Sequence, residues 1–129
     1  MTSYGFRELV FSLLINSPLP GMISGEIYNG QRPINSVLED ITILSPSGKN
    51  AQIQERIVNV NIYVNDEMLG TEWVEDGRRG KELAQAVWDV LDDKVTGRYW
   101  LTILDQATLK VLDVNQHCIN FSLLIKYRK

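Results

Sequence analysis

The sequence holds one histidine and one cysteine, and they are neighbours, His117 and Cys118. Imidazole and thiolate are ligands that zinc prefers, and the same pair could act as base and nucleophile. Adjacent strand residues point to opposite faces, so the two side chains cannot easily meet at one ion or substrate. We therefore interpret both as strand residues near a sheet edge. With no other soft ligand in the sequence, we expect no metal, no cofactor and no catalytic residue.

A second candidate for chemistry is the polar segment Ser45 to Asn50, which contains Ser47-Gly48-Lys49. These three residues resemble the end of a phosphate-binding loop. The full Gly-x-x-x-x-Gly-Lys-Ser/Thr pattern is missing, as is the strand-loop-helix context that it needs. The sequence contains no Gly-x-Ser-x-Gly nucleophile elbow either. We interpret the segment as a solvated loop tip.

The carboxylates form scattered pairs, Glu39-Asp40, Glu75-Asp76 and Asp92-Asp93, with Glu72 alone. Acid–base catalysis needs two carboxyl groups that face one cleft and have separated pKa values. No pair has a diagnostic spacing, so we expect these side chains to be solvated, as unpaired charges usually are. A small enzyme of another type would need a pocket in which at least two carboxyl groups converge.

The basic run Arg78-Arg79-Gly80-Lys81 opens the second predicted helix, where positive charge opposes the helix dipole. Two interpretations remain open. The run could meet an acidic neighbouring chain or a nucleic-acid backbone. It could equally be a solvated helix start whose charge is compensated by Glu75, Asp76 and Glu82, because such surface pairs are common and weak.

Three aromatic residues lie outside the predicted core. Trp73 falls in the connection Asp66 to Asp76, and Tyr28 and Tyr63 fall on or beside strand faces that are otherwise polar. Exposed aromatic side chains commonly anchor protein interfaces, although a tryptophan can also fold back onto the core. The candidate interface residues of the whole sequence are Tyr28, Arg32, Asn61, Tyr63, Trp73, Arg78 and Arg79.

The clearest element is a strand predicted over Gln52 to Asn65. Its alternation places the apolar side chains Val58, Val60, Ile62 and Val64 on one face and Asn59, Asn61 and Tyr63 on the other, as in a half-buried strand. We expect the apolar face to lie beneath the helix that contains Leu83 to Leu91. The polar face is where a neighbouring subunit would be expected.

Other periodic segments supply the rest of the fold. Helical spacing predicts helices over Ser3 to Ile15 and Gly77 to Asp93, the second with a stripe of Leu83, Val87 and Leu91 that Ala84, Trp88 and Val90 join. The remaining predicted strands are Ser24 to Tyr28, Glu39 to Leu44, Arg98 to Gln106, Leu109 to Val114 and His117 to Tyr127. Asn29-Gly30 is a signal for a tight hairpin turn.

This order of elements predicts an α+β fold, an antiparallel β-sheet with two helices packed on one face, in a single domain over residues 1–129. The hydrophobic content of 44% and the formal net charge of −3 are those of an ordinary globular protein. The acidic balance disfavours nucleic acid as a partner. The sequence shows no targeting signal and no apolar run that would span a bilayer, so we expect an intracellular protein without a membrane partner.

The element order resembles that of the phage tail-completion and head–tail joining family, small structural proteins of tailed phages and prophages. The resemblance runs from about Phe6 to Tyr127. It is carried by the helix ending in Pro18-Leu-Pro20 with the strand Gly25-Glu-Ile-Tyr28, and by Gln31-Arg-Pro33 leading to Glu39-Asp-Ile-Thr-Ile43. Two further segments carry it: the strand Gln54 to Val64 with the helix Gly80 to Leu91, and the C-terminal hairpin closing on Ile119 to Tyr127. The acidic connection Asp66 to Asp76 departs from the family's typical form.

The resemblance implies a non-enzymatic protein of virion assembly. Such a protein would form a ring-like homo-oligomer, with a hexamer as the expected size, between the tail tube and the head connector. Its partners would be copies of itself and other tail or connector proteins. It would be found in the cytoplasm of a bacterial host, or in the virion if the phage is active. The strand Gln52 to Asn65 and its polar loops would supply subunit contacts.

An alternative is a small non-enzymatic binding module that recognises a peptide by adding it to an exposed sheet edge. That function would need one long unpaired strand at the edge of an otherwise closed monomer.

Overall fold

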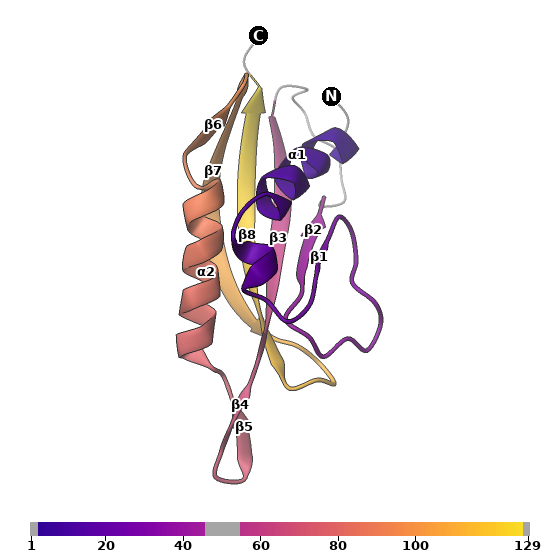
Figure 1. Cartoon of the computed structure of the whole chain (residues 1–129), viewed down its shortest axis with the longest axis vertical. Coiled ribbons are helices and arrows are strands. Elements are labelled where there is room, and N and C mark those ends of the chain that lie inside the picture. Colours follow the sequence, from indigo (N-terminus) through magenta and orange to yellow (C-terminus); the bar gives the residue numbers. More distant parts are fainter. Residues whose placement is uncertain (1–2, 46–54, 128–129) are drawn as a thin grey trace.

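A computed structural model describes residues 3–45 and 55–127 of the chain. The predicted loop tip is therefore outside the described residues from position 46 onwards, as are the first three positions of the predicted long strand. Figure 1 shows the α-helices in front of a long, curled sheet, with a narrow hairpin extending from one end. The elements, in chain order, are α1 (Ser3–Ile15), a short 3-10 helix η1 (Leu19–Gly21), β1 (Ile27–Tyr28), β2 (Ile41–Leu44), β3 (Glu55–Asn65), β4 (Glu67–Leu69), β5 (Glu72–Val74), α2 (Gly77–Leu91), β6 (Lys94–Thr96), β7 (Tyr99–Lys110) and β8 (Gln116–Tyr127).

Six strands form the main sheet in the order β1-β2-β3-β8-β7-β6. β3 and β8 pair antiparallel along eleven positions at its centre, from Glu55 with Lys126 to Asn65 with Gln116. The other pairs are antiparallel except β1 with β2, which run parallel. The tight hairpin predicted at Asn29-Gly30 is therefore wrong, because parallel strands need a longer crossover and the chain supplies it between Tyr28 and Ile41.

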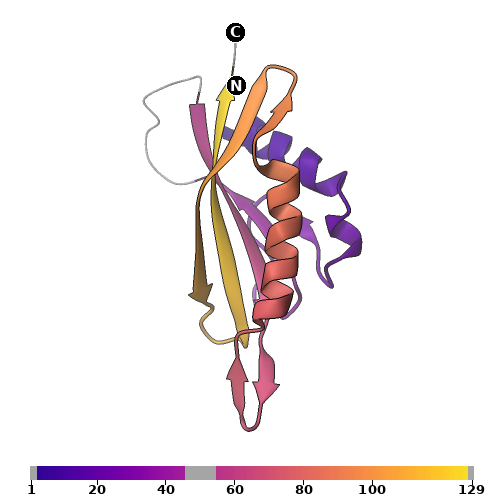
Figure 2. The ribbon, with the colours of Figure 1, turned by 90° about the vertical axis from the view of Figure 1, so that its left-hand side faces the viewer.

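Both helices cover the same face of the sheet, as the view in Figure 2 shows from the side. α1 buries Phe6, Val10 and Leu14 at helical spacing, and α2 buries Leu83, Val87 and Leu91. The predicted α+β fold, a mainly antiparallel sheet with two helices on one face, is confirmed. Trp88 was predicted to join the apolar stripe of α2. In the structure it lies beside the buried stripe, and its side chain is 39% exposed.

The central strands alternate between buried and partly exposed positions, as predicted. On β3 the buried residues are Val58, Val60, Ile62 and Val64. On β8 they are Ile119, Phe121, Leu123 and Ile125. These eight side chains join those of the helices in one hydrophobic core, so burial of the apolar face is what fixes the register of the sheet.

The structure differs from the predicted elements in several places. β1 and β2 begin later than predicted, and α2 ends at Leu91. The segments predicted as two strands, Arg98 to Gln106 and Leu109 to Val114, contain one continuous strand, β7, with a register shift between Ile103 and Asp105. The short β6 pairs with the start of β7 and was not predicted. The connection Asp66 to Asp76 contains a separate hairpin, β4 with β5. No helix within the described ranges is both long and apolar enough to cross a membrane.

Candidate interaction surface

In the described part of the chain, no helix or strand packs over the central strands on the face of the sheet opposite the helices (Figures 1 and 2). The register places its side chains in rows across the strands. One row runs from Tyr28 on β1 through Thr42 and Asn61 to Asn120 and Ala107 on β7. We call this side of the molecule the open face.

Polar side chains pair with one another along the middle of the open face. Asn120 Nδ2 donates to Asn61 Oδ1 at 2.6 Å. One row further along, Ser122 Oγ donates to Asn59 Oδ1 at 3.4 Å. Each of these residues is only partly exposed. The pairs form a short ladder of side-chain hydrogen bonds between β3 and β8.

The next row of the open face is less polar and consists of Tyr63, Cys118 and Leu109. Burial raises the pKa of the Cys118 thiol to about 11, so the group is protonated at neutral pH and a poor nucleophile. Burial also raises the pKa of the Tyr63 phenol. Leu109 is exposed. This row therefore offers an aromatic and aliphatic contact surface rather than a reactive one.

Arg32 covers one end of this row. Its guanidinium carbon lies 3.6 Å from the centre of the Tyr63 ring, a cation–π contact. Its Nη2 donates to Gln116 Oε1 at 2.9 Å, and its Nη1 lies 3.4 Å from Asp40 Oδ2. These three contacts hold the loop between β1 and β2 against the open face. Ile34 in that loop is 91% exposed, beside a shallow pocket of about 280 Å³ that Arg32 and Tyr63 also line.

Asp40 supports the same loop from inside. Its side chain is fully buried, and its two oxygens accept hydrogen bonds from Glu26 N at 3.1 Å and from Ser36 Oγ at 2.5 Å. Glu39 is buried as well, at 8% exposure. The prediction that the Glu39-Asp40 pair is solvated is therefore wrong. Burying a charged carboxylate costs free energy, and pairing with a cation offsets that cost. Each of these two carboxylates has a cationic partner, which is why both can be buried.

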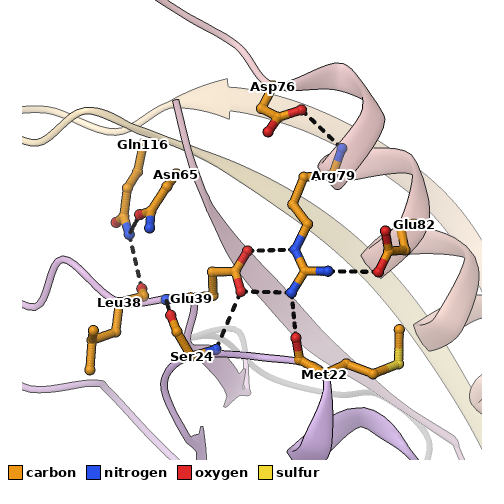
Figure 3. A network of polar contacts seen from close by, with 9 residues as sticks. All are labelled: Met22, Ser24, Leu38, Glu39, Asn65, Asp76, Arg79, Glu82 and Gln116. Atoms are coloured by element: carbon orange, nitrogen blue, oxygen red, sulfur yellow. Dashed lines mark hydrogen bonds and ion pairs between the residues drawn. The ribbon is translucent and has the colours of Figure 1, made fainter. Parts of the chain in front are cut away.

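The partner of Glu39 is Arg79, as Figure 3 shows. Arg79 Nε lies 2.7 Å from Glu39 Oε2, and its Nη2 lies 2.8 Å from Glu39 Oε1, a bidentate pair. The same Nη2 donates to the Met22 carbonyl oxygen, and Nη1 lies 2.6 Å from Glu82 Oε1. The hydrogen bonds from Arg79 hold the pKa of the Glu39 carboxyl below its usual value. This arginine ties α2 to the segments on either side of β1.

The start of α2 explains how the basic run is tolerated. Asp76 is the N-cap, and its Oδ1 accepts a hydrogen bond from Arg79 N at 3.0 Å. Glu82 pairs with Arg79. The carboxylates of Asp76 and Glu82 therefore compensate the positive charge of the helix start, as in the interpretation of the basic run as a solvated helix start. Arg78 is exposed, so it contributes surface charge at this end of the molecule.

His117 and Cys118 lie on opposite faces of a strand, as predicted, but the prediction that they lie near a sheet edge is wrong, because β8 is a central strand that pairs with both β3 and β7. His117 Nδ1 lies 2.5 Å from Asp66 Oδ1, on the other side of β8 from the open face that Cys118 joins. Lys110 Nζ lies 3.1 Å from Asp66 Oδ2. In the described part of the chain, no cluster of three or more histidine, cysteine or acidic side chains could hold a metal ion. The histidine contacts the carboxylate of Asp66, which Lys110 also pairs with, at the base of the β4–β5 hairpin.

The structure thus divides the seven candidate interface residues. Tyr28, Arg32, Asn61 and Tyr63 come together on the open face. The other three lie elsewhere. Trp73 is on the β4–β5 hairpin, Arg78 is at the exposed start of α2, and Arg79 pairs with Glu39. Sequence reasoning did not include Cys118, Asn120 and Ser122 in the surface, although alternate residues of the predicted strand His117 to Tyr127 must lie on one face.

The similarity of this chain to known proteins is structural. Its fold is similar to that of a chain in the virion of a native gene transfer agent particle, with a TM-score of 0.67 and 14% sequence identity over 95% of this chain and 94% of the other. At that identity the match shows a shared fold. No protein-family model and no curated protein matches the sequence.

Proposed function

We propose that this protein is a structural component of a phage or phage-like particle, which acts in tail completion and head–tail joining through subunit contacts. The observation that carries the proposal is the open face, a surface built for contact and not for chemistry. The fold similarity to a chain of a gene transfer agent virion supports it, because the match covers nearly all of both chains. The order of elements, which resembles that of tail-completion proteins, points to the same class.

The composition of the open face suits a protein interface. Tyr63 and Arg32 belong to the residue types enriched at binding hot spots. They lie beside the exposed side chains of Ile34 and Leu109 and next to the hydrogen-bonded pair of Asn61 and Asn120. Because this pair already makes one hydrogen bond within the chain, a second chain that covered the surface would leave fewer polar groups unpaired, which lowers the free-energy cost of binding.

The proposed assembly is a ring-like homo-oligomer, with a hexamer as the expected size, that contacts other tail or connector proteins. A closed ring requires a heterologous contact, in which two different surfaces of each subunit meet. The open face is one such surface. In this proposal the protein is made in the bacterial cytoplasm, becomes part of the particle and catalyses no reaction.

Size-exclusion chromatography with multi-angle light scattering, over a series of protein concentrations, tests the proposal. The protein is expected to form a discrete oligomer, either alone or after mixing with the tail-tube and connector proteins encoded by neighbouring genes. Isolated subunits of such assemblies can be monomeric until a partner is present. A chain that remains a monomer at every concentration, and also in the presence of those partners, would overturn the proposal.

A second candidate function is peptide recognition by strand addition, and one observation favours it. β6 pairs only with Tyr99 to Leu101, and among the described residues no strand lies beside the outer edge of β7 beyond that point. An extended peptide could add there. The two functions are distinguished by stoichiometry, since strand addition gives a one-to-one complex with a peptide and leaves the protein monomeric.

A further inference from the structure

The β4–β5 hairpin extends from the end of the molecule, away from the main sheet (Figures 1 and 2). Its two strands pair with each other only, as a separate two-stranded sheet. Its large apolar side chains are exposed: Met68 at 51%, Leu69 at 70% and Trp73 at 50%. A hairpin of this size is marginally stable on its own, so an apolar tip that projects into solvent indicates an element that binds something.

The hairpin also carries charge of one sign. The segment from Asp66 to Asp76 contains five acidic residues and no lysine or arginine. Asp66 is used internally by His117, and Asp76 caps α2. The remaining three carboxylates, those of Glu67, Glu72 and Glu75, are exposed. The surface that receives this hairpin should therefore be apolar at its centre and positively charged around it.

A surface with an apolar centre and two cationic side chains lies at the opposite end of the molecule, where Asp93 Oδ1 also accepts a hydrogen bond from Trp100 Nε1 and Glu55 is the cross-strand neighbour of Lys126. A pocket of about 410 Å³ is lined by the β6–β7 turn and the end of β8, with Val95, Trp100, Arg98 and Lys126 in its walls. Lys126 Nζ lies 5.5 Å from the centre of the Trp100 ring. No ion pair within the described ranges engages Arg98 or Lys126. Figure 1 places this turn and the β4–β5 hairpin at opposite ends of the longest axis.

The pocket belongs to the open face. Lys126 follows Cys118 and Asn120 at even intervals along β8, and it pairs in register with Trp100, which pairs in turn with Val95. Side chains at even intervals share one face of a strand. A chain that packed on the open face would therefore reach this pocket without crossing to another side of the molecule.

We infer that the β4–β5 hairpin of one copy of this chain docks in the Val95–Trp100 pocket of the next copy. The apolar residues Met68 and Trp73, which are cross-strand partners on one side of the hairpin, would pack against Trp100. The exposed glutamates would face Arg98 and Lys126. The contact joins two different surfaces, so it would propagate head to tail and close into a ring if the rotation allows. This inference rests on the proposed function, because it specifies the second surface that a ring requires.

Charge reversal tests the docking. Glu72→Lys and Arg98→Glu, each alone, should weaken self-association at least tenfold, because each places like charges opposite one another. The two changes combined in one chain should restore association, since every subunit then offers a lysine to a glutamate of the next. Both positions are exposed, so the fold is expected to survive, and the thermal midpoint of each variant checks that it does.

Tryptophan truncation supplies a matched comparison. Trp73→Ala should also weaken self-association at least tenfold, whereas Trp88→Ala, at another partly exposed tryptophan, should leave it unchanged.

Contact between the hairpin and the pocket is tested by cross-linking in a Cys118→Ser background. Chains carrying Thr71→Cys and chains carrying Val95→Cys are mixed and treated with a short bismaleimide. The expected product is a dimer that contains one chain of each kind, with few dimers of two like chains.

The outcomes separate this inference from the proposed function. If the wild-type chain forms its oligomer but the hairpin and pocket variants assemble equally well, the docking is overturned and the proposed function stands. The docking is also overturned if these variants lose binding to another particle protein while self-association is unchanged. If the wild-type chain never associates with itself or with its partners, both fail together.

Discussion

Glu39 and Arg79, forty positions apart in the sequence, form a bidentate ion pair with N–O distances of 2.7 and 2.8 Å (Figure 3). The pair joins the start of α2 to the segment that leads into β2. Arg79 also binds the Met22 carbonyl, so one side chain connects three parts of the chain next to β1. These contacts hold both ends of the segment that contains β1 and the loop between β1 and β2. The open face depends on this loop because the loop carries Arg32.

Arg79→Ala should lower the free energy of unfolding by about 2–3 kcal/mol, since it leaves the Glu39 carboxylate and the Met22 carbonyl without their partner. The side chain is 27% exposed, so the loss should fall below that for a fully buried pair. Arg78→Ala is the matched control. This neighbour is exposed, and its removal should change stability by less than about 0.5 kcal/mol. Urea denaturation measures both, and equal losses would contradict the role assigned to Arg79.

The ion pair also predicts how stability depends on pH. The pKa of Glu39 lies below its ordinary value of 4.5 in the folded chain, because Arg79 stabilises the charged form. A carboxyl group whose pKa is lower in the folded chain than in the unfolded chain stabilises the fold at any pH above its ordinary pKa. This contribution is lost as the pH falls through the pKa of the folded chain. The stability difference between the wild type and Glu39→Gln should therefore shrink between about pH 6 and about pH 3. A difference that stays constant in thermal denaturation over that range would contradict the pairing.

Gly25 lies against the buried carboxylate that supports the same loop. A Cβ atom there would lie 1.9 Å from Asp40 Oδ1 and 2.7 Å from the Glu39 carbonyl oxygen. Because backbone would have to move, Gly25→Ala should destabilise the fold by about 1–3 kcal/mol. Gly21→Ala is the control, since a Cβ at that position meets nothing within 4 Å. Melting temperatures of the two variants test this, and a stable Gly25→Ala chain would show that the segment packs differently.

Cys118 provides a probe of the open face. With a pKa of about 11 its thiol is almost wholly protonated at neutral pH, and only the thiolate reacts quickly with alkylating reagents. Alkylation by iodoacetamide should be slow in the folded chain and should accelerate as the pH rises towards 11. The denatured chain, in which the thiol regains its ordinary value of 9.0, should react faster at every pH below that. Equal rates in the two states would contradict the burial of this row.

Periodicity predicted the parts of the fold that have one buried face. The helices and the strands β3 and β8 each bury residues on one side, so their patterns are readable without any partner. The β4–β5 hairpin was missed because Met68, Leu69 and Trp73 are exposed, and neither strand shows an alternation of burial. β6 was missed because it is three residues long and its side chains are mostly exposed.

The candidate site was predictable where it lies on one strand and not where it depends on distant contacts. Asn61 and Tyr63 were identified from the polar positions of β3. The local signal at Asn29-Gly30 predicted a hairpin, whereas the long-range contacts of Arg32 with Asp40 and Gln116 decide the path of that loop. The conflict of charge with the helix dipole singled out Arg79, but its partner Glu39 could not be identified from its neighbours in the sequence.

The central claim is that the open face is a subunit contact, and light scattering of a face variant tests it most directly. In the variant, Asn61→Lys adds a charge to the polar ladder and Tyr63→Glu replaces the aromatic ring. Both positions are partly exposed, and a carboxylate at position 63 could still pair with Arg32, so the fold should be retained in circular dichroism. Gln85→Lys, on the exposed side of α2, is the control. Under conditions in which the wild type and the control form the oligomer, the double variant should be a folded monomer. A double variant that is folded and assembles as the wild type does would show that the open face is not the interface.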